Sequence, residues 1–201
     1  MLRRAIFATF VLLTALGVLF VSIYRATTIR FDFSEPNNSA TGEVFTSSVE
    51  YSLPYPGILP DHPLWIVKAA RDGTILFTTV DSYKKAQKNL FLADSRLVMA
   101  RELQENGKDE LSVSTALKAQ GYLAEALEWG KDADVRGYDS SGFYETLYKS
   151  SLVHREVLEE IMQNLPEEAR PIVNQAVGQT TRITQDSVVL LQQKGKAIPQ
   201  I

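Results

Sequence analysis

Residues with the potential for chemistry are few in this chain, and they are widely separated. Histidine, the side chain that most often transfers protons or binds metals near neutral pH, occurs only as His62 and His154. Neither has a second histidine or a suitably spaced set of carboxylates around it, as a metal site would need. The chain has no cysteine, which excludes thiol catalysis, disulfides and thiolate metal sites. We therefore expect no catalytic residue, no cofactor and no metal, and we expect that the protein is not an enzyme.

Each histidine has a structural interpretation that competes with a chemical one. Asp61 and His62 are adjacent and could act as an acid and base pair. However, an aspartate placed just before Pro63 is typical of a helix start, where its carboxylate caps free amides. His154 falls near the inner stripe of a predicted helix, which favours a hydrogen-bonded histidine of the core or its boundary over a catalytic base.

Four stretches after residue 80 repeat apolar residues in steps of three and four, the pattern of a helix that buries one stripe. The expected helices run from Asp81 to Asn106, from Asp109 to Trp129, from Ser140 or Ser141 to Asn164, and from Glu167 to Lys194. We expect Gly107, Gly130 and Gly195 to end three of them, because glycine enters the left-handed conformation without strain. The predicted inner residues are Tyr83, Ala86, Leu90, Ala93, Leu97, Ala100 and Leu103; Val113, Ala116, Leu117, Leu123, Ala124 and Leu127; Tyr144, Leu147, Ser151, Leu158, Ile161 and Leu165; and Ala169, Ile172, Val173, Ala176, Ile183, Val188, Leu190 and Leu191.

These stripes predict an all-α fold with an antiparallel up-and-down bundle of about four long helices. Each helix would be about 33 to 42 Å long, and short connections make successive helices antiparallel. Two helical hairpins packed loosely in an elongated arrangement are an alternative. The heptad-like spacing of the first long helix also leaves a coiled-coil dimer open, and with it a homo-oligomer.

A dense motif, Pro60-Asp61-His62-Pro63-Leu64-Trp65-Ile66-Val67-Lys68, precedes the long helices. We interpret it as the start of a short helix that is capped by Asp61 and ended by Gly73. We expect Trp65 to be buried against the bundle; an exposed partner contact is the alternative. The candidate residues for an interaction or structural motif are Asp61, Pro63, Leu64, Trp65 and Lys68.

The motif and the helix after it resemble a bacterial domain family of unknown function, found in secreted and membrane-anchored proteins. In that family an opening of the type Pro-x-Asp-x-Pro-Leu-Tyr-x-x-Lys precedes long helices with an Arg-Leu-x-x-Ala turn. The corresponding residues here are Pro60, Asp61, Pro63, Leu64, Trp65 and Lys68, then Arg96, Leu97 and Ala100. Trp65 departs from the usual tyrosine, and Pro60 directly precedes Asp61. The resemblance covers residues 51–128 and implies an extracytoplasmic helical module without a stated activity.

Aromatic residues gather around the turn between the second and third long helices. They are Tyr122, Trp129, Tyr138, Phe143 and Tyr144. Such residues are more often core than ligand cage, but they are also the best candidates for an aromatic contact surface.

Residues 5–24 form an unbroken apolar run without charge, and 20 residues at about 1.5 Å each match the roughly 30 Å hydrocarbon core of a bilayer. We therefore predict a transmembrane anchor, with the lipid bilayer as its partner. A cleaved signal peptide is the competing interpretation, and the exit of the run fits it poorly because Tyr24 would occupy the small-residue position for a cut after Ala26. Arg3 and Arg4 favour a cytoplasmic N-terminus.

The expected organisation is a cytoplasmic stub at 1–4, the anchor at 5–24, a stalk or extended strap at 25–60, and an extracytoplasmic helical domain at 61–201. The net charge is −3 with both signs interspersed, so nucleic acid is not an expected partner. The sequence thus predicts a single-pass cell-membrane protein that acts as an interaction or structural component of the bacterial cell envelope, with a protein partner. A ligand-binding or sensory bundle that acts through a partner is the alternative.

Overall fold

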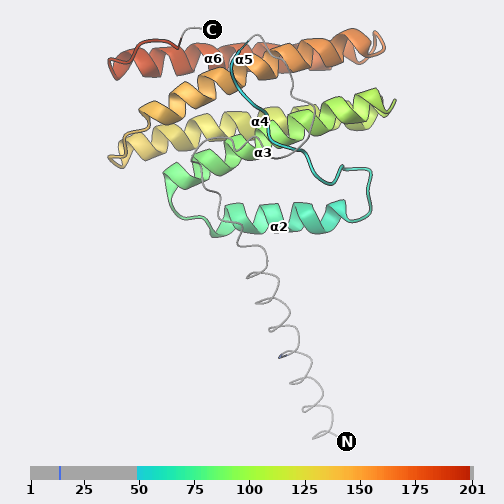
Figure 1. Cartoon of the computed structure of the whole chain (residues 1–201), viewed down its shortest axis with the longest axis horizontal. Helices are drawn as coiled ribbons and strands as arrows, with labels where there is room; N and C mark the ends of the chain where they lie inside the picture. The colour runs from blue at the N-terminus through green and yellow to red at the C-terminus, as the bar shows by residue number, and fades with distance from the viewer. Residues whose placement is uncertain (1–13, 15–48, 200–201) are drawn as a thin grey trace, which may run out of the picture. The chain divides into compact units, whose positions relative to one another are not determined.

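A computed structural model describes residue 14 and residues 49–199 of the chain. Residues 49–199 form five helices and no strand, which confirms the predicted all-helical fold. The helices are α2 (Trp65–Thr78), α3 (Ser82–Glu105), α4 (Asp109–Val135), α5 (Ser141–Asn164) and α6 (Arg170–Gln193), shown in Figure 1.

The N-terminal predictions fall almost entirely on residues that are not described. The stub at 1–4, the anchor at 5–24 except residue 14, and the stalk as far as residue 48 lie outside the described residues. None of the helices among the described residues has the length and apolar character needed to cross a bilayer. The chain divides into two compact units, Met1–Ser39 and Ala40–Ile201, and the fold below is that of the second.

The four long helices form a bundle that is built from two hairpins. The most extensive contacts are between α3 and α4 and between α5 and α6. The hairpins meet where α4 contacts α6 and α3 contacts α5, and successive helices alternate in direction (Figure 1). A helical bundle is therefore confirmed, with its hairpins packed on one another.

Helix α3 is, together with α5, one of the two most enclosed helices. Its predicted stripe is correct, since Ala86, Ala93, Leu97 and Ala100 are buried in the core. Between Ala93 and Leu97, the other sides of α3 are covered too, because Asp94, Ser95 and Arg96 are also buried. The preceding segment and α2 contribute to this cover through contacts made by Tyr51 and Trp65. The helix thus carries polar groups that have been removed from water.

The inner stripe of α4 differs from the prediction. Leu117 and Ala124 are exposed, and the buried positions instead recur as Ser112, Ala116, Ala119, Leu123, Ala126, Gly130 and Ala133. These residues are spaced alternately by four and three, and all except Leu123 have small side chains, which allow α3 and α4 to approach closely. The hydrogen bond of 2.6 Å from Ser112 Oγ to the carbonyl of Ala100 is made across this contact.

Helices α5 and α6 follow their predicted stripes more closely. On α5, the predicted inner residues of the helix and the following Leu165 are all buried. On α6, Val173, Ala176, Ile183 and Leu191 are buried, whereas Ile172 is 46% exposed. The prediction for Ile172 is wrong because the neighbouring Val173, which is 0% exposed, occupies the inward position of this turn and leaves Ile172 off the buried stripe.

Two predicted glycine stops are correct and two are wrong. Gly107 and Gly195 have φ values of 71° and 67° and follow the ends of α3 and α6. Gly73 lies inside α2, which continues to Thr78, and Gly130 lies inside α4, which continues to Val135. Gly130 is needed there for space, because a Cβ atom would lie 2.7 Å from Cε1 of Phe143.

The last part of the predicted strap, from Val49 onward, is described and lies on the helical domain without regular secondary structure. Val49 belongs to the core, and Tyr51 and Leu53 pack against it. The chain then turns at Gly57, where φ is 71°, before it enters α2. This strap positions Tyr51 over the middle of α3.

Candidate functional site

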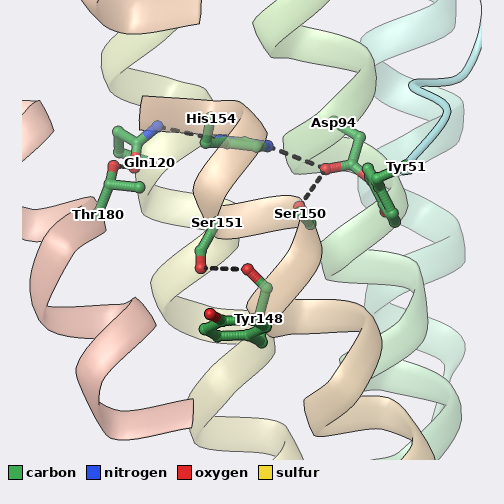
Figure 2. Close-up of polar contacts among 8 residues, drawn as sticks. All are labelled: Tyr51, Asp94, Gln120, Tyr148, Ser150, Ser151, His154 and Thr180. Atoms are coloured by element: carbon green, nitrogen blue, oxygen red, sulfur yellow. Dashed lines mark hydrogen bonds and ion pairs between the residues drawn. The ribbon is translucent and has the colours of Figure 1, made fainter. Parts of the chain in front are cut away.

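A chain of buried polar residues crosses the bundle and joins all four long helices to the strap (Figure 2). We call it the buried polar network; its members are Tyr51, Asp94, Gln120, Ser150, His154 and Thr180. At its centre, Oδ1 of Asp94 accepts a hydrogen bond of 2.7 Å from Ser150 and lies 2.9 Å from Nε2 of His154. Oδ2 of the same carboxylate accepts a hydrogen bond of 2.5 Å from Tyr51.

The other half of the network fixes the orientation of the histidine ring. Nδ1 of His154 lies 3.1 Å from Nε2 of Gln120, and Oε1 of Gln120 accepts a hydrogen bond of 2.6 Å from Thr180. With this amide orientation Gln120 donates to Nδ1, so the histidine carries its proton on Nε2 and donates it to Asp94. Both ring nitrogens of His154 are therefore hydrogen-bonded.

Electrostatics in the network favour a neutral phenol at Tyr51. Burial, and then the neighbouring Asp94 carboxylate, raise the pKa of Tyr51 well above its ordinary value. A protonated phenol is the form that can donate to the carboxylate. Three donors around one carboxylate offset the loss of its hydration, which is the condition under which a carboxylate is tolerated in a core.

The geometry of the network is that of a structural polar core. His154 is 0% exposed, and Ser150 donates to Asp94 rather than to the histidine, so no hydroxyl is aligned for activation as a nucleophile. Among the described residues no group of histidine, aspartate and glutamate side chains could hold a metal ion. The interpretation of His154 as a hydrogen-bonded core residue is confirmed.

The opening motif is a helix start, but Asp61 does not cap it. The N-cap position of α2 is Leu64, without a side-chain cap, and its amide donates to Nδ1 of His62 at 3.1 Å. The carboxylate of Asp61 instead forms an ion pair with Lys108, at the connection between α3 and α4. That hydrogen bond lowers the pKa of Asp61. The predicted cap is therefore wrong because an ammonium group competes for the carboxylate.

The structure brings two residues of the motif together with two residues from the long helices. We call this group the Arg96 cluster; its members are Trp65, Lys68, Arg96 and Tyr122. The guanidinium carbon of Arg96 lies 4.9 Å from the ring centre of Trp65 and 5.0 Å from that of Tyr122. Lys68 Nζ lies 5.4 Å from the same Trp65 ring and donates to the carbonyl of Pro56 at 2.6 Å. Trp65 is half-buried against Arg96 of α3, so its predicted burial against the bundle is reached only in part.

The remaining motif residues, Pro63 and Leu64, are exposed at the start of α2. They adjoin a continuous apolar surface that the sequence reasoning missed. We call it the α2 face; its members are Ile66, Val67, Ala70, Thr74 and Phe77, all exposed and all on one side of the helix. Phe77 is 88% exposed and Ile66 is 74% exposed. Lys68 and Asp72 lie on the opposite side of the helix, and Arg71 lies at the edge of the α2 face, one turn after Val67.

The predicted aromatic surface divides into three places. Phe143 packs edge-on against both Tyr83 and Tyr144, and Tyr138 stacks on Tyr83 with ring centres 6.2 Å apart. Trp129 lies apart from this group, under Lys85, whose Nζ is 3.9 Å from its ring centre. The third place is the Arg96 cluster, which contains Tyr122. Phe143 and Tyr144 are therefore core residues.

Tyr144 also belongs to a partly buried ionic group at the end of the aromatic core. Its hydroxyl donates to Asp134 at 2.8 Å, and the same carboxylate lies 2.9 Å from Nζ of Lys194. Burial opposes ionisation of Asp134, but the hydrogen bonds from Lys194, Tyr144 and Ser140 outweigh it and lower the pKa of Asp134. Burial and the same hydrogen bond raise the pKa of Tyr144.

A family model described as a domain of unknown function, DUF5667, matches residues 57–168, more than half of the chain. The chain belongs to the DUF5667 family. This confirms the resemblance to a family of unknown function. The DUF5667 match begins later than the predicted range of 51–128 and extends through all of α5. The DUF5667 domain thus contains the Arg96 cluster and the α2 face, whereas Tyr51 and Thr180 lie outside it. No curated protein and no solved structure matches the chain.

Proposed function

We propose that this protein is a membrane-anchored extracytoplasmic interaction module of the bacterial cell envelope, and that the α2 face is its contact surface for a protein partner. The observation that carries the proposal is the exposure of apolar side chains along one side of α2. Fully burying a side chain such as phenylalanine, isoleucine or valine stabilises a complex by about 1.5–3 kcal/mol. Ile66, Val67 and Phe77 together therefore offer several kcal/mol that the isolated chain does not use.

A protein partner fits the α2 face better than a bilayer surface does. Helices that lie on membranes usually carry free basic side chains on their polar side, which reach the lipid headgroups. On α2 the two basic residues are already engaged, since Lys68 donates to Pro56 and Arg71 pairs with Asp72 at 2.8 Å. Lys68 lies on the side of the helix opposite to the α2 face, and Arg71 lies at the edge of that face.

The membrane part of the proposal rests on the apolar run at 5–24 and on its arginine flank. Reporter fusions after Tyr55 test it. We expect activity only from a reporter that works outside the cytoplasm, together with a chain that retains its N-terminus. Activity only from a cytoplasm-dependent reporter would reverse the orientation, and a mature chain beginning near Val18 or Thr27 would show that the anchor is removed.

The contact surface is tested by the variant Phe77→Ser in the full chain, isolated from membranes together with its partners. The side chain is 88% exposed, so we expect an unchanged fold and a loss of associated protein. Val189→Ser is the matched control, because Val189 is 49% exposed on α6, away from the α2 face. Equal recovery of partners with both variants would contradict the proposal.

The alternative function, a ligand-binding or sensory bundle that acts through a partner, is favoured by one observation. Arg96 is buried, with 6% of its surface exposed, and it forms no ion pair with any described carboxylate. A buried cation of this kind is a candidate for ligand binding.

A further inference from the structure

Arg96 is a buried charge that forms no ion pair among the described residues. Its Nε atom is buried and has no hydrogen-bond partner, and the hydroxyl of the preceding Ser95 is likewise buried without a partner. Buried polar atoms are almost always hydrogen-bonded, so orphaned neighbours on one turn of a helix call for an explanation. Helix α3 therefore carries two buried donors without hydrogen-bond partners, and Trp65 of α2 lies against one of them, Arg96.

The aromatic contacts of Arg96 do not compensate for its burial. Interactions of a cation with aromatic ring faces are worth about 0.5–2 kcal/mol each, whereas moving a charge out of water costs several kcal/mol. Neither Trp65 nor Tyr122 accepts a conventional hydrogen bond with its ring face. The two rings hold the guanidinium group in place and leave its N–H donors available, which is the arrangement in which arginine binds an oxyanion with its fork of donors.

The charges around Arg96 indicate what kind of oxyanion would fit. Three charged residues act on Lys68, namely the cations Arg71 and Arg96 and the carboxylate of Asp72, and Arg71 is already paired with Asp72. Burial lowers the pKa of Lys68, and the nearby cations Arg71 and Arg96 act in the same direction, against Asp72. Lys68 and Arg96 thus have no carboxylate partner among the described residues, although Lys68 donates to the carbonyl of Pro56. A carboxylate would neutralise one of them, whereas a phosphate group carries a charge of about −1.5 to −2 at neutral pH.

We propose that the Arg96 cluster is a binding site for a phosphate group of the dianionic kind, such as inorganic phosphate or a phosphate monoester. Arg96 donates its fork to the phosphate oxygens, Lys68 contributes a second positive charge, and the rings of Trp65 and Tyr122 form the walls. The proposal deepens the ligand-binding alternative. It is independent of the α2 face, because binding is measured on the purified chain without any partner.

Trp65 provides a direct readout of this site. The chain has two tryptophans, so the variant Trp129→Phe leaves Trp65 as the only one. We would titrate inorganic phosphate into the full chain carrying this substitution, in nonionic detergent and at constant ionic strength, and record the Trp65 fluorescence. The account predicts a saturable change. Adding Arg96→Met should raise the phosphate concentration for the half-maximal change by about 10- to 100-fold, the range expected for lost charge-assisted hydrogen bonds.

Two further variants keep the result interpretable. Arg182→Met removes the same charge from an exposed position on α6 and should leave the titration unchanged. Arg96→Lys keeps the charge and removes the fork, so it should weaken binding by about 10-fold and serves as the test should the methionine variant not fold.

Acetate and vesicles containing phosphatidylglycerol distinguish the ligand sources. We expect neither the carboxylate nor the lipid phosphodiester to match phosphate. A response that does not saturate, or a response that survives Arg96→Met in a folded chain, would overturn the site. A response to acetate or to the vesicles equal to that of phosphate would overturn its assignment to a dianionic phosphate.

Discussion

Gly130 offers a sharp test of the packing between the two hairpins. It lies inside α4, where replacing glycine by alanine ordinarily stabilises a helix by about 1 kcal/mol. Here a Cβ atom would lie 2.7 Å and 3.0 Å from two ring carbons of Phe143 and 3.2 Å from Cε1 of Tyr144. The ring of Phe143 is 3% exposed and is flanked by Tyr83 and Tyr144, so it has little room to move.

Overpacking of such a site costs about 1–3 kcal/mol, which exceeds the gain in helix propensity. We therefore expect Gly130→Ala to lower the free energy of unfolding by about 1–2 kcal/mol. Gly121→Ala, in the same helix, is the matched control. A Cβ atom there meets nothing within 4 Å, so this variant should raise the free energy of unfolding by about 0.5–1 kcal/mol.

The assay is urea unfolding of a fragment comprising residues 40–201, the second compact unit, followed by far-ultraviolet circular dichroism. The two substitutions have the same chemistry and opposite expected signs, so general effects of alanine cancel. If Gly130→Ala is as stable as the parent or more stable, the contact between α4 and the start of α5 is not the one described.

Three other predictions concern the same fragment. We expect a soluble fragment with a predominantly helical circular dichroism spectrum, because the four long helices bury one another's apolar stripes; a spectrum dominated by strand or coil would contradict the bundle. Asp94→Ala should lower the free energy of unfolding by about 3–5 kcal/mol, because it leaves three buried donors without an acceptor. The control variant Asp186→Ala breaks an exposed ion pair and should lower the free energy of unfolding by at most about 1 kcal/mol. Similar urea midpoints for the two variants would refute the buried polar network. The pKa of Asp134 is lowered in the folded state, so the unfolded state binds more protons as the pH falls below the ordinary value of 3.8. The stabilising contribution of Asp134 is thus fully present above that value and is lost as the pH falls through the folded pKa. Asp134→Asn should therefore make the urea midpoint less sensitive to pH in that range. An unchanged pH dependence would contradict the lowered pKa of Asp134.

The sequence predicted the helices well wherever large apolar residues mark the buried side. The stripes of α3 and α5 were correct because leucine, isoleucine and tyrosine recur there against polar neighbours. The stripe of α4 was partly wrong because its inner side is built from Ser112, Ala116, Ala119 and Gly130, which do not contrast with the outer side. Small residues line the inner side of α4 because α3 and α4 approach closely. The distance between two helices cannot be read from the sequence pattern of one of them.

The sites were harder to predict because they depend on which helices meet. Asp94 and Gln120 were not singled out, although each directly follows an inner-stripe alanine and extends the stripe with a polar residue, and this was the available signal. Arg96 was noticed only through the family resemblance. Its proximity to Trp65 and Tyr122 joins three elements far apart in sequence and could not be read from spacing.

The absence of an activity and of a cofactor, the candidate status of Asp61 and Leu64 as interaction residues, and the open question of a homo-oligomer all remain predictions. A coiled-coil dimer through α3 has little surface available, since one side of that helix is covered by the bundle and Arg96 on another side is covered by α2.

The most direct test of the proposed function is site-specific photo-crosslinking in intact cells. A photo-reactive residue replaces Phe77 on the α2 face in one strain and Val189 on α6 in another, at exposed positions of the same full-length chain. The account predicts a discrete crosslinked protein from position 77 that is absent from position 189. No product at position 77 beyond that seen at position 189, or crosslinking to lipid alone, would contradict a protein partner at the α2 face.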